Sequence, residues 1–447
     1  MEDLILKTVC AFLKVHYNPK QPVLLAFSGG SDSLALLHLL QAYGKSHALS
    51  LALVHVDHGW REESRQEAEH IAAMAASMGL PLHQKRLQPS TLKGNLEAAC
   101  REERLHFFRE LCTLHNYQAV LLAHHADDQA ETVLKRALEG ASLANLGGLL
   151  PETALYGMKL WRPLLAIPKK KLSAWLAQQQ LVGFHDSTNE DPRYLRARMR
   201  TTIIPQLSQD FGKEVNGNLC LLGQDAVELR AYLDQRVAPY LNRLARNHLG
   251  SFLDLSQQRP QAAFEVKHLI RCFAEANDFT LSRTCLDTAA TLFLQGAANK
   301  RVEVGSRYLF IDRFCLFAPQ AQEVVLPPAG VTLQAGQTFN YGPWSIHTST
   351  VEWDSSFLKT DWSALWCRGG EVVLPAGNYE LVSPTESACY PRNSPLKKWW
   401  STHKVPAFMR FLVPVVQQNG KVYHEFLTGR STPTLAKGQL GLKVVIR

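Results

Sequence analysis

The first two hundred residues of the chain repeat one pattern, in which a short run of apolar residues precedes a longer stretch with helical periodicity. The runs 23–27, 49–56 and 119–125 lack the strict alternation of polar and apolar residues that a half-exposed strand shows. Such strands are buried on both faces, as they are in a parallel sheet that helices cover. The N-terminal part of the chain is therefore predicted to be an α/β domain with a parallel sheet.

Beyond residue 205 the pattern changes twice. Residues 206–300 are mainly helical, and 301–318 has the form of a β-hairpin. The segment 320–345 is rich in proline and glycine and indicates a connection into β-rich structure. A chain of 447 residues is long enough for two or three domains. We expect an α/β domain over 1–205, a mainly helical domain with a β-hairpin over 206–360, and a small β-rich domain over 361–447.

Composition limits the class of protein. With 46% hydrophobic and 20% charged residues, the chain has the composition of a globular protein and not of a disordered one. Its nine cysteines form no C-x-x-C pair and indicate neither a disulfide framework nor a paired-thiol zinc site, which fits a reducing compartment. No run approaches the roughly 18 apolar residues of a membrane span, and the N-terminus has the pattern of an amphipathic helix. We expect a cytoplasmic protein without a membrane segment, and no feature indicates an obligate protein partner.

A Ser/Gly loop, S-G-G-S-D-S, lies between the strand 23–27 and a helical stretch over 33–43. Its two glycines allow the backbone to approach an anion, and the helix that follows presents free N–H groups and a favourable dipole. The chain has no G-K-[ST] nearby, which excludes the P-loop that binds β and γ phosphates. Asp32 is unexpected beside an anion unless it holds Mg²⁺. The predicted phosphate-binding residues are Ser28, Gly29, Gly30, Ser31, Asp32 and Ser33.

Polar side chains also follow the next two predicted strands. His55 and Asp57 end the second strand, and the segment 124–132, H-H-A-D-D-Q-A-E-T, ends the third. In an open α/β sheet these positions share one edge with the phosphate loop, where ligands bind. Alternatively, the histidines are strand-end residues satisfied by neighbours, and Asp127 and Asp128 suit a helix dipole. A zinc site is disfavoured, because adjacent histidines point apart on a strand and no cysteine accompanies them.

The Ser/Gly loop resembles the pyrophosphate-binding loop of the PP-loop ATPases, or N-type ATP pyrophosphatases, which cleave ATP between the α and β phosphates. Further segments resemble one family of this superfamily, the tRNA(Ile)-lysidine synthetases. The matching segments are H-V-D-H-G-W-R at 55–61, G-N-x-E at 94–97, H-H-A-D-D-Q-A-E-T at 124–132, R-P-L-L at 162–165, S-T-N-E-D at 187–191, and K-K at 397–398 with Pro406 and Arg410. The chain departs from the family pattern at Trp60, Leu105, Thr188 and Ala197.

This resemblance implies an adenine-nucleotide alpha-hydrolase-like domain that ligates L-lysine to C2 of the wobble cytidine in the CAU anticodon of tRNA(Ile). ATP would adenylate the cytidine with Mg²⁺ present, and the ε-amine of free L-lysine would displace AMP after pyrophosphate has left. The resemblance implies catalytic roles for Asp32, His125, Asp128, Arg196 and Arg200, ATP contacts from the loop with His55 and Asp57, and Mg²⁺ ligation by Asp32 and Asp128. Contacts to lysine or tRNA are expected from Asp127, Glu131, Arg162, Asn189, Tyr194, Lys397, Lys398 and Arg410.

The charge distribution agrees with an RNA substrate. The chain carries a net +8, and residues 159–200 contain nine basic and three acidic residues, a local net of +6. Arginines can bind phosphate with two hydrogen bonds, and Trp161 or Tyr194 could stack on an extruded base. For the lysines at 169–171, a solvated helix face is an equally good interpretation. In the terminal domain we expect the aromatic residues to be mostly buried and the lysines to face outward.

Three other functions fit the sequence less well. A tRNA thiolation enzyme of the same superfamily would need a reactive cysteine near the site, whereas Cys100 and Cys112 lie in a predicted helix away from the strand ends. An amidotransferase-coupled synthetase would need a glutaminase segment, which the sequence lacks. A non-catalytic RNA-binding protein with a relic ATP loop is disfavoured, because the Ser/Gly loop and both aspartates are intact.

Overall fold

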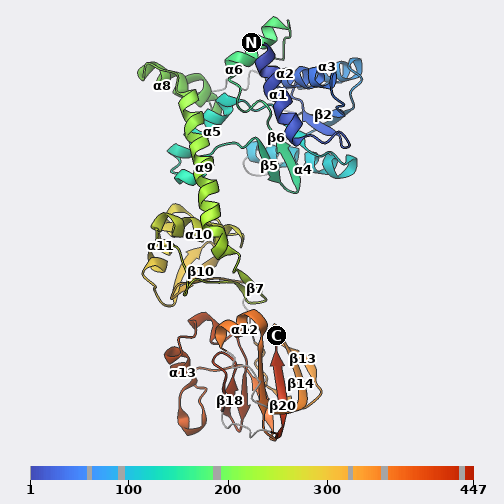
Figure 1. Ribbon diagram of the computed structural model, residues 1–447. Coiled ribbons are helices and arrows are strands. Elements are labelled where there is room, and N and C mark those ends of the chain that lie inside the picture. The colour runs from blue at the N-terminus through green and yellow to red at the C-terminus, as the bar shows by residue number, and fades with distance from the viewer. Residues whose placement is uncertain are drawn as a thin grey trace. The chain divides into compact units, whose positions relative to one another are not determined.

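The computed structural model describes residues 2–57, 63–88, 96–184, 193–320, 326–353, 361–431 and 438–447. The chain consists of two compact units, Met1–Arg230 and Ala231–Arg447 (Figure 1). Residues 206–230, expected in the helical domain, thus belong to the first unit. Among the described residues, no helix combines the length and the apolar character needed to cross a membrane.

A six-stranded sheet forms the centre of the first unit, with the strand order β3-β2-β1-β4-β6-β5. Neighbouring strands are parallel except at the edge, where β5 runs antiparallel to β6, so the predicted α/β class is confirmed. The chain moves from β1 to β2 on one side and returns to place β4 on the other. This reversal creates a crevice at the carboxyl ends of β1 and β4, where ligands bind in such sheets. The strands are β1 (Val23–Ala26), β2 (Leu51–Asp57), β3 (Leu82–Arg86), β4 (Val120–Leu121), β5 (Glu152–Leu155) and β6 (Met158–Trp161).

Helices cover both faces of this sheet because alternate residues of each strand face opposite cores. Val23 and Leu25 of β1 pack in one core with α1, α2 and α6, whereas Leu24 packs in the other with Phe108 of α4. Helix α2 is apolar on most of its surface, as expected for a helix buried between a sheet and other helices. The helices are α1 (Glu2–His16), α2 (Ser31–Gly44), α3 (Glu63–Ser77), α4 (Leu96–His115), α5 (Ala126–Leu138) and α6 (Lys169–Gln178).

A second group of helices follows the sheet in the first unit. Helix α7 (Leu195–Arg198) continues through a π-helical segment, η4 (Met199–Ile203), into α8 (Ile204–Asp210). Helix α9 (Asn216–Leu241) comes next and extends past the boundary between the two units. The π-helical segment carries Arg200, and such irregular turns are frequent at functional sites because they redirect a side chain.

After the end of α9, the second unit contains a five-stranded antiparallel sheet of order β7-β8-β11-β10-β9. Leu253 and Leu316 face helices α10 and α11, whereas Phe252 and Phe317 on the opposite face stack with ring centroids 4.8 Å apart. The predicted hairpin over 301–318 is a three-stranded meander, and β7 and β8 lie in a stretch expected to be helical. The elements are β7 (Ala245–Asn247), β8 (Gly250–Asp254), α10 (Ala263–Glu275), α11 (Arg283–Leu294), β9 (Lys300–Val304), β10 (Arg307–Asp312) and β11 (Cys315–Pro319).

Two further antiparallel sheets, of orders β12-β16-β17-β18-β19 and β13-β14-β20-β15, complete the β-rich C-terminal region. Strand β14 pairs with β20 along seven residues, so the domain boundary expected near 360 falls inside a sheet. Their elements are β12 (Val331–Leu333), β13 (Thr338–Tyr341), β14 (Trp344–Glu352), α12 (Trp362–Arg368), β15 (Gly370–Leu374), β16 (Tyr379–Val382), α13 (Leu396–Thr402), β17 (Val415–Gln418), β18 (Lys421–Glu425), β19 (Arg430–Ser431) and β20 (Leu440–Ile446).

Gly183 supports the Ser/Gly loop from a distant part of the sequence, and its replacement tests this packing. A Cβ atom at Gly183 would lie 2.5 Å from the Ser31 backbone nitrogen and 2.8 Å from the Ser31 Cα. We predict that Gly183→Ala lowers the free energy of unfolding by about 1–3 kcal/mol, because backbone atoms must move apart. Gly217→Ala, where nothing lies within 4 Å, should leave it unchanged or raise it slightly. Urea unfolding followed by circular dichroism measures both, and equal stability of the two variants would contradict the prediction.

Candidate active site

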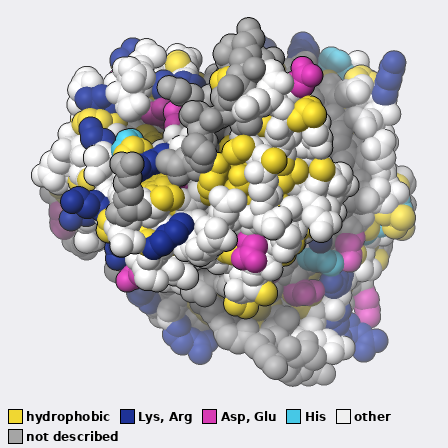
Figure 2. Space-filling view, turned by 90° about the horizontal axis from the view of Figure 1, so that it is seen from below, with side chains coloured by type: hydrophobic (Ala, Val, Ile, Leu, Met, Phe, Trp, Pro, Cys, Tyr) yellow, Lys and Arg dark blue, Asp and Glu magenta, His cyan; other side chains and the backbone are white. Residues whose placement is uncertain are grey.

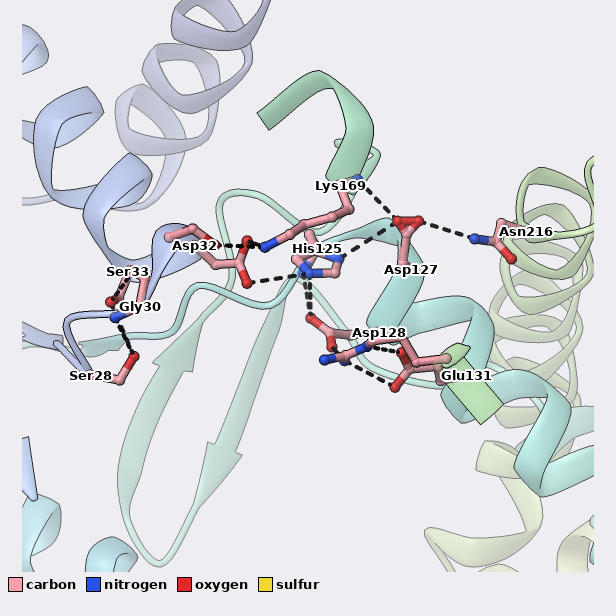
Figure 3. A network of polar contacts seen from close by, with 12 residues as sticks. Ser28, Gly30, Asp32, Ser33, His125, Asp127, Asp128, Glu131, Lys169 and Asn216 are labelled. Carbon is pink, nitrogen blue, oxygen red and sulfur yellow. Dashed lines mark hydrogen bonds and ion pairs between the residues drawn. The ribbon is translucent and has the colours of Figure 1, made fainter. Parts of the chain in front are cut away.

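The Ser/Gly loop is held in shape by its own hydroxyl groups (Figure 3). Ser28 Oγ accepts a hydrogen bond from the Gly30 N–H at 3.3 Å, and the Ser33 hydroxyl donates to the Gly30 carbonyl at 3.0 Å. Gly29 has a φ of 80°, and the Phe184 ring occupies the place of a side chain there. No side chain caps α2 at Gly30, so the N–H groups of its first turn are available to an anion.

Lys169, the first residue of α6, supplies the positive charge that the loop itself lacks. Its ammonium donates to the Ser31 hydroxyl at 2.9 Å and to the Asp32 carboxylate. The Lys169 side chain therefore points to the loop and does not form a simple solvated helix face, whereas Lys170 and Lys171 are exposed. An RNA contact by these lysines stays a prediction. No local signal could have indicated this contact, because Lys169 lies 137 residues from Asp32 in the chain.

His125 lies between two carboxylates that come from different strand ends. It is the N-cap of α5, and its Nε2 lies 3.6 Å from Asp32 Oδ2 and 3.5 Å from Asp128 Oδ2. Burial alone would lower the pKa of His125, but the interactions with Asp32 and Asp128 outweigh it and raise the pKa. Burial opposes ionisation of Asp32 as well, yet the hydrogen bonds from His125 and Lys169 lower its pKa to about 2. The cluster thus favours an imidazolium beside two carboxylates.

His124, the preceding residue, has the opposite character. Burial first, and then the charges of Arg162 and other arginines, lower the pKa of His124 to about 4. Arg162 Nε donates to His124 Nδ1 at 3.2 Å, which requires that nitrogen to carry no proton. Arg162 is 7% exposed and also donates to the Leu150 carbonyl and the Thr153 hydroxyl. A direct substrate contact, as expected for Arg162, does not fit this burial, because its guanidinium is engaged in orienting His124.

Arg200 joins the acidic residues on α5. Its Nη2 lies 3.0 Å from Asp128 Oδ1, and its Nε donates to Glu131 Oε1 at 2.8 Å. Burial raises the pKa of Glu131 more than the Arg200 guanidinium lowers it. Asp127 is oriented differently, since its two oxygens accept from the backbone N–H of Lys169 and from the side chain of Asn216. Asn216, at the start of α9, was not among the predicted residues.

His55 and Asp57 lie at the end of β2, next to the loop. His55 Nδ1 lies 3.0 Å from the Phe27 carbonyl oxygen, and Asp57 Oδ2 lies 3.3 Å from Arg86 Nε. Together with Arg65 and Gln84 these residues line a pocket. His55 thus connects this pocket to Phe27, the residue that precedes the phosphate loop. This position suits the ATP contacts expected for His55 and Asp57.

The remaining candidates of the first unit lie outside this network. Arg196 is exposed on α7, and its charge contributes to lowering the pKa of His124. Tyr194 is 39% exposed, whereas Trp161 is 1% exposed and donates to Glu152. The stacking role considered for Trp161 is therefore wrong, because a base cannot reach a buried ring. Asn189 lies outside the described residues.

In the second unit, Lys397 and Lys398 are exposed on α13, and Lys397 pairs with Glu386 at 3.0 Å. Arg410 instead donates to the Val405 carbonyl and the Ser401 hydroxyl, so it stabilises the turn that follows α13. Trp400 is 1% exposed, as expected for a core residue. Figure 2 shows a face of the molecule on which Lys and Arg side chains are dispersed, while hydrophobic side chains gather near its centre.

A parallel sheet with an uncapped Ser/Gly loop after β1 and an acidic cluster after β4 defines the PP-loop class of ATP-binding domains. The family model of the PP-loop domain matches residues 4–207, which confirms this class. Along almost its whole length the chain is similar to a named relative from Protochlamydia amoebophila, tRNA(Ile)-lysidine synthase. The two are 36% identical over 441 residues, 98% of this chain and 96% of the relative. The chain belongs to the tRNA(Ile)-lysidine synthase family, and it is an ATP-dependent ligase.

Two further similarities were found. A tRNA(Ile)-lysidine synthase from Chlamydia muridarum is 40% identical over 272 residues, 60% of this chain and 83% of the relative. Among solved structures, the U34-tRNA thiolase NcsA from Methanococcus maripaludis is 17% identical with a TM-score of 0.41, covering 51% of this chain and 80% of the thiolase.

His125 should titrate above the ordinary histidine pKa of 6.5, and His124 should titrate below it. For His125 the pKa is raised, so its contribution to stability is complete below pH 6.5 and is lost as pH rises through the folded-state pKa. For His124 the pKa is lowered to about 4, so its contribution is complete above pH 6.5 and declines as pH falls toward 4. Histidine-selective NMR titration measures both pKa values.

Asp32→Asn should lower the pKa of His125, because it removes the negative charge beside Nε2. Asp225→Asn on the exposed side of α9 is the matched control and should change neither histidine. Titration of both histidines near pH 6.5 in the unmodified protein would contradict the assignment.

Proposed function

We propose that the chain ligates L-lysine to C2 of the wobble cytidine in the CAU anticodon of tRNA(Ile), through an adenylated cytidine. The observation that carries this proposal is the network joining Asp32, His125 and Asp128 beside the phosphate loop (Figure 3). Arg200 extends this network, since it pairs with Asp128. The name of the relatives supports the choice of lysine and of this tRNA. The reaction releases pyrophosphate in the first step and AMP in the second.

The loop side of the site would stabilise the departing pyrophosphate. The free N–H groups at the start of α2 and the Lys169 ammonium all lie at the loop, where negative charge increases as the bond to the α phosphate breaks. Lys169 contacts both Ser31 and Asp32, so it is held there before a nucleotide binds. Charge stabilisation that is arranged in advance costs no reorganisation during the reaction.

Asp32 and Asp128 have the donor chemistry that Mg²⁺ requires. Each carboxylate directs its Oδ1 toward a cationic side chain and its Oδ2 toward His125. Carboxylate oxygens are the ligands that Mg²⁺ prefers, and the ion would neutralise charge on the ATP phosphates. A bound cation and a protonated His125 would both be positive beside the same oxygens, so each would weaken the other. The protonated His125 would therefore balance the charge of the two carboxylates when the metal is released.

Arg200, Glu131 and Asp128 would act on the tRNA and lysine side. The Arg200 side chain is 43% exposed while bound to both carboxylates, so its guanidinium can still reach a phosphate oxygen. The Glu131 carboxylate, only 3% exposed and with a raised pKa, would hold Arg200 in place. Asp128 would then accept the proton of the lysine ε-amine as it attacks. Lys397, Lys398, Tyr194 and Arg196 remain proposed tRNA contacts.

Sulfur transfer is the competing function, and the cysteine chemistry disfavours it. Cys220 is in contact with the site, since its thiol donates to the Ala126 carbonyl at 3.2 Å. Burial, with the Asp127 charge, raises the pKa of Cys220 to about 11, and burial raises that of Cys112 to about 11. A thiol with such a pKa is a poor nucleophile at neutral pH, because almost none of it is thiolate.

Replacing Lys169 tests its role at the phosphate loop. We predict that Lys169→Met lowers kcat/KM for ATP by about 100-fold, because one charge that stabilises departing pyrophosphate is lost. Lys170→Met is the matched control, since Lys170 is exposed on the same helix. Pyrophosphate release with saturating tRNA and lysine gives both values. Equal activity of the two variants would remove Lys169 from the mechanism.

The substrate assignment is tested with an isoleucine tRNA transcript that carries the CAU anticodon. With ATP, Mg²⁺ and labelled L-lysine, one lysine should be incorporated per tRNA. The same transcript with uridine at the wobble position should accept none, because uracil has N3–H and a C4 carbonyl where cytosine has an unprotonated N3 and a C4 amine. Failure to incorporate lysine, with sulfur incorporated from a sulfide donor instead, would show that the thiolation function is correct.

A further inference from the structure

A second cluster of chemically reactive side chains lies in the second unit, between α9 and α10. Asp234 is on the part of α9 that belongs to this unit, and His268 and Cys272 are one turn apart on α10. Residues four apart on a helix lie on the same face, so the imidazole and the thiol both face α9. His268 is 2% exposed, whereas the Asp234 side chain is 50% exposed.

The three donor atoms converge on one point. His268 Nε2 lies 2.7 Å from Asp234 Oδ1 and 3.5 Å from Cys272 Sγ, and Cys272 Sγ lies 3.9 Å from Asp234 Oδ1. In a tetrahedral zinc site, with bonds of about 2.0–2.3 Å, neighbouring donor atoms are about 3.3–3.7 Å apart. The aspartate and histidine atoms must separate by about half an ångström, and the sulfur and the aspartate oxygen must approach by about 0.2 Å. A movement of the half-exposed Asp234 side chain changes both distances.

The same geometry disfavours a Cys-His-Asp catalytic triad. In a triad the nucleophile and the carboxylate contact different nitrogens of the imidazole, which connects them in series. Here the sulfur and the carboxylate oxygen both contact Nε2 of His268. Such a convergent arrangement suits three ligands of one ion and not a proton relay.

We propose that Asp234, His268 and Cys272 bind one Zn²⁺ ion, with water in the fourth position. Thiolate and imidazole ligands select borderline-soft cations such as Zn²⁺ over Mg²⁺ or Ca²⁺. The exposed side of Asp234 gives the ion access from solvent, and the buried His268 fixes the site to α10. On binding, the Cys272 thiol releases its proton to solvent. The ion joins α9 to α10, so it stabilises this unit and takes no part in the ligation.

Metal titration of the full-length protein tests the site. After treatment with a chelator, the protein should bind one equivalent of Zn²⁺, and one equivalent of Co²⁺ should produce a thiolate-to-cobalt charge-transfer band in the near ultraviolet. Cys272→Ser should abolish this band and weaken Zn²⁺ binding at least tenfold. Cys285→Ser is the matched control on α11, since its thiol contacts the Glu303 carbonyl and lies outside the cluster.

A second variant makes the outcome independent of the cysteine. Asp234→Asn leaves a half-exposed position nearly unchanged in shape, and it should also weaken Zn²⁺ binding at least tenfold. Zn²⁺ should raise the thermal unfolding temperature of the unmodified protein and of Cys285→Ser, but of neither cluster variant. Absence of stoichiometric binding, or unchanged affinity in Cys272→Ser or Asp234→Asn, would overturn the proposal.

Discussion

The convergence of two carboxylates on a buried imidazole is the interaction on which the active site depends. Asp32 follows β1 and Asp128 follows β4, and their like charges can lie close together only because His125 and two further cations are placed among them. Lys169 and Arg200 each engage one carboxylate from the side away from the histidine. Three cations therefore offset the two carboxylates, and in the proposed function the carboxylate oxygens would hold a metal while the cations would bind phosphate.

The fold makes this arrangement possible by bringing distant segments to one sheet edge. Parallel strands β1 and β4 are neighbours, so the loop and the α5 N-terminus meet at the point where the strand order reverses. Helix α6 then adds Lys169, the π-helical segment adds Arg200, and α9 adds Asn216 against Asp127. In the proposed reaction, adenylation needs positive charge at the leaving group and the later attack of lysine needs a base near the amine, and these groups come from different elements.

Much of this could be predicted from the sequence, because contiguous residues carry it. The buried strands have continuous apolar runs, and the Ser/Gly loop and the segment 124–132 directly follow two of them. Lys169 and Asn216 were missed because tertiary folding alone brings them to the site. The boundary expected near 360 divides a sheet for a similar reason, since β14 pairs with β20, almost a hundred residues later. Local patterns do not encode such long-range pairing.

The most direct test of the central claim is transfer of the α phosphate of labelled ATP to isoleucine tRNA when lysine is absent. The account predicts that AMP label accumulates on the wobble cytidine with the unmodified protein. With Asp32→Ala, no label should be transferred, although the tRNA still binds with the same Kd, because the carboxylate that His125 and Lys169 hold at the loop is missing. Transfer at an undiminished rate in Asp32→Ala would contradict the account.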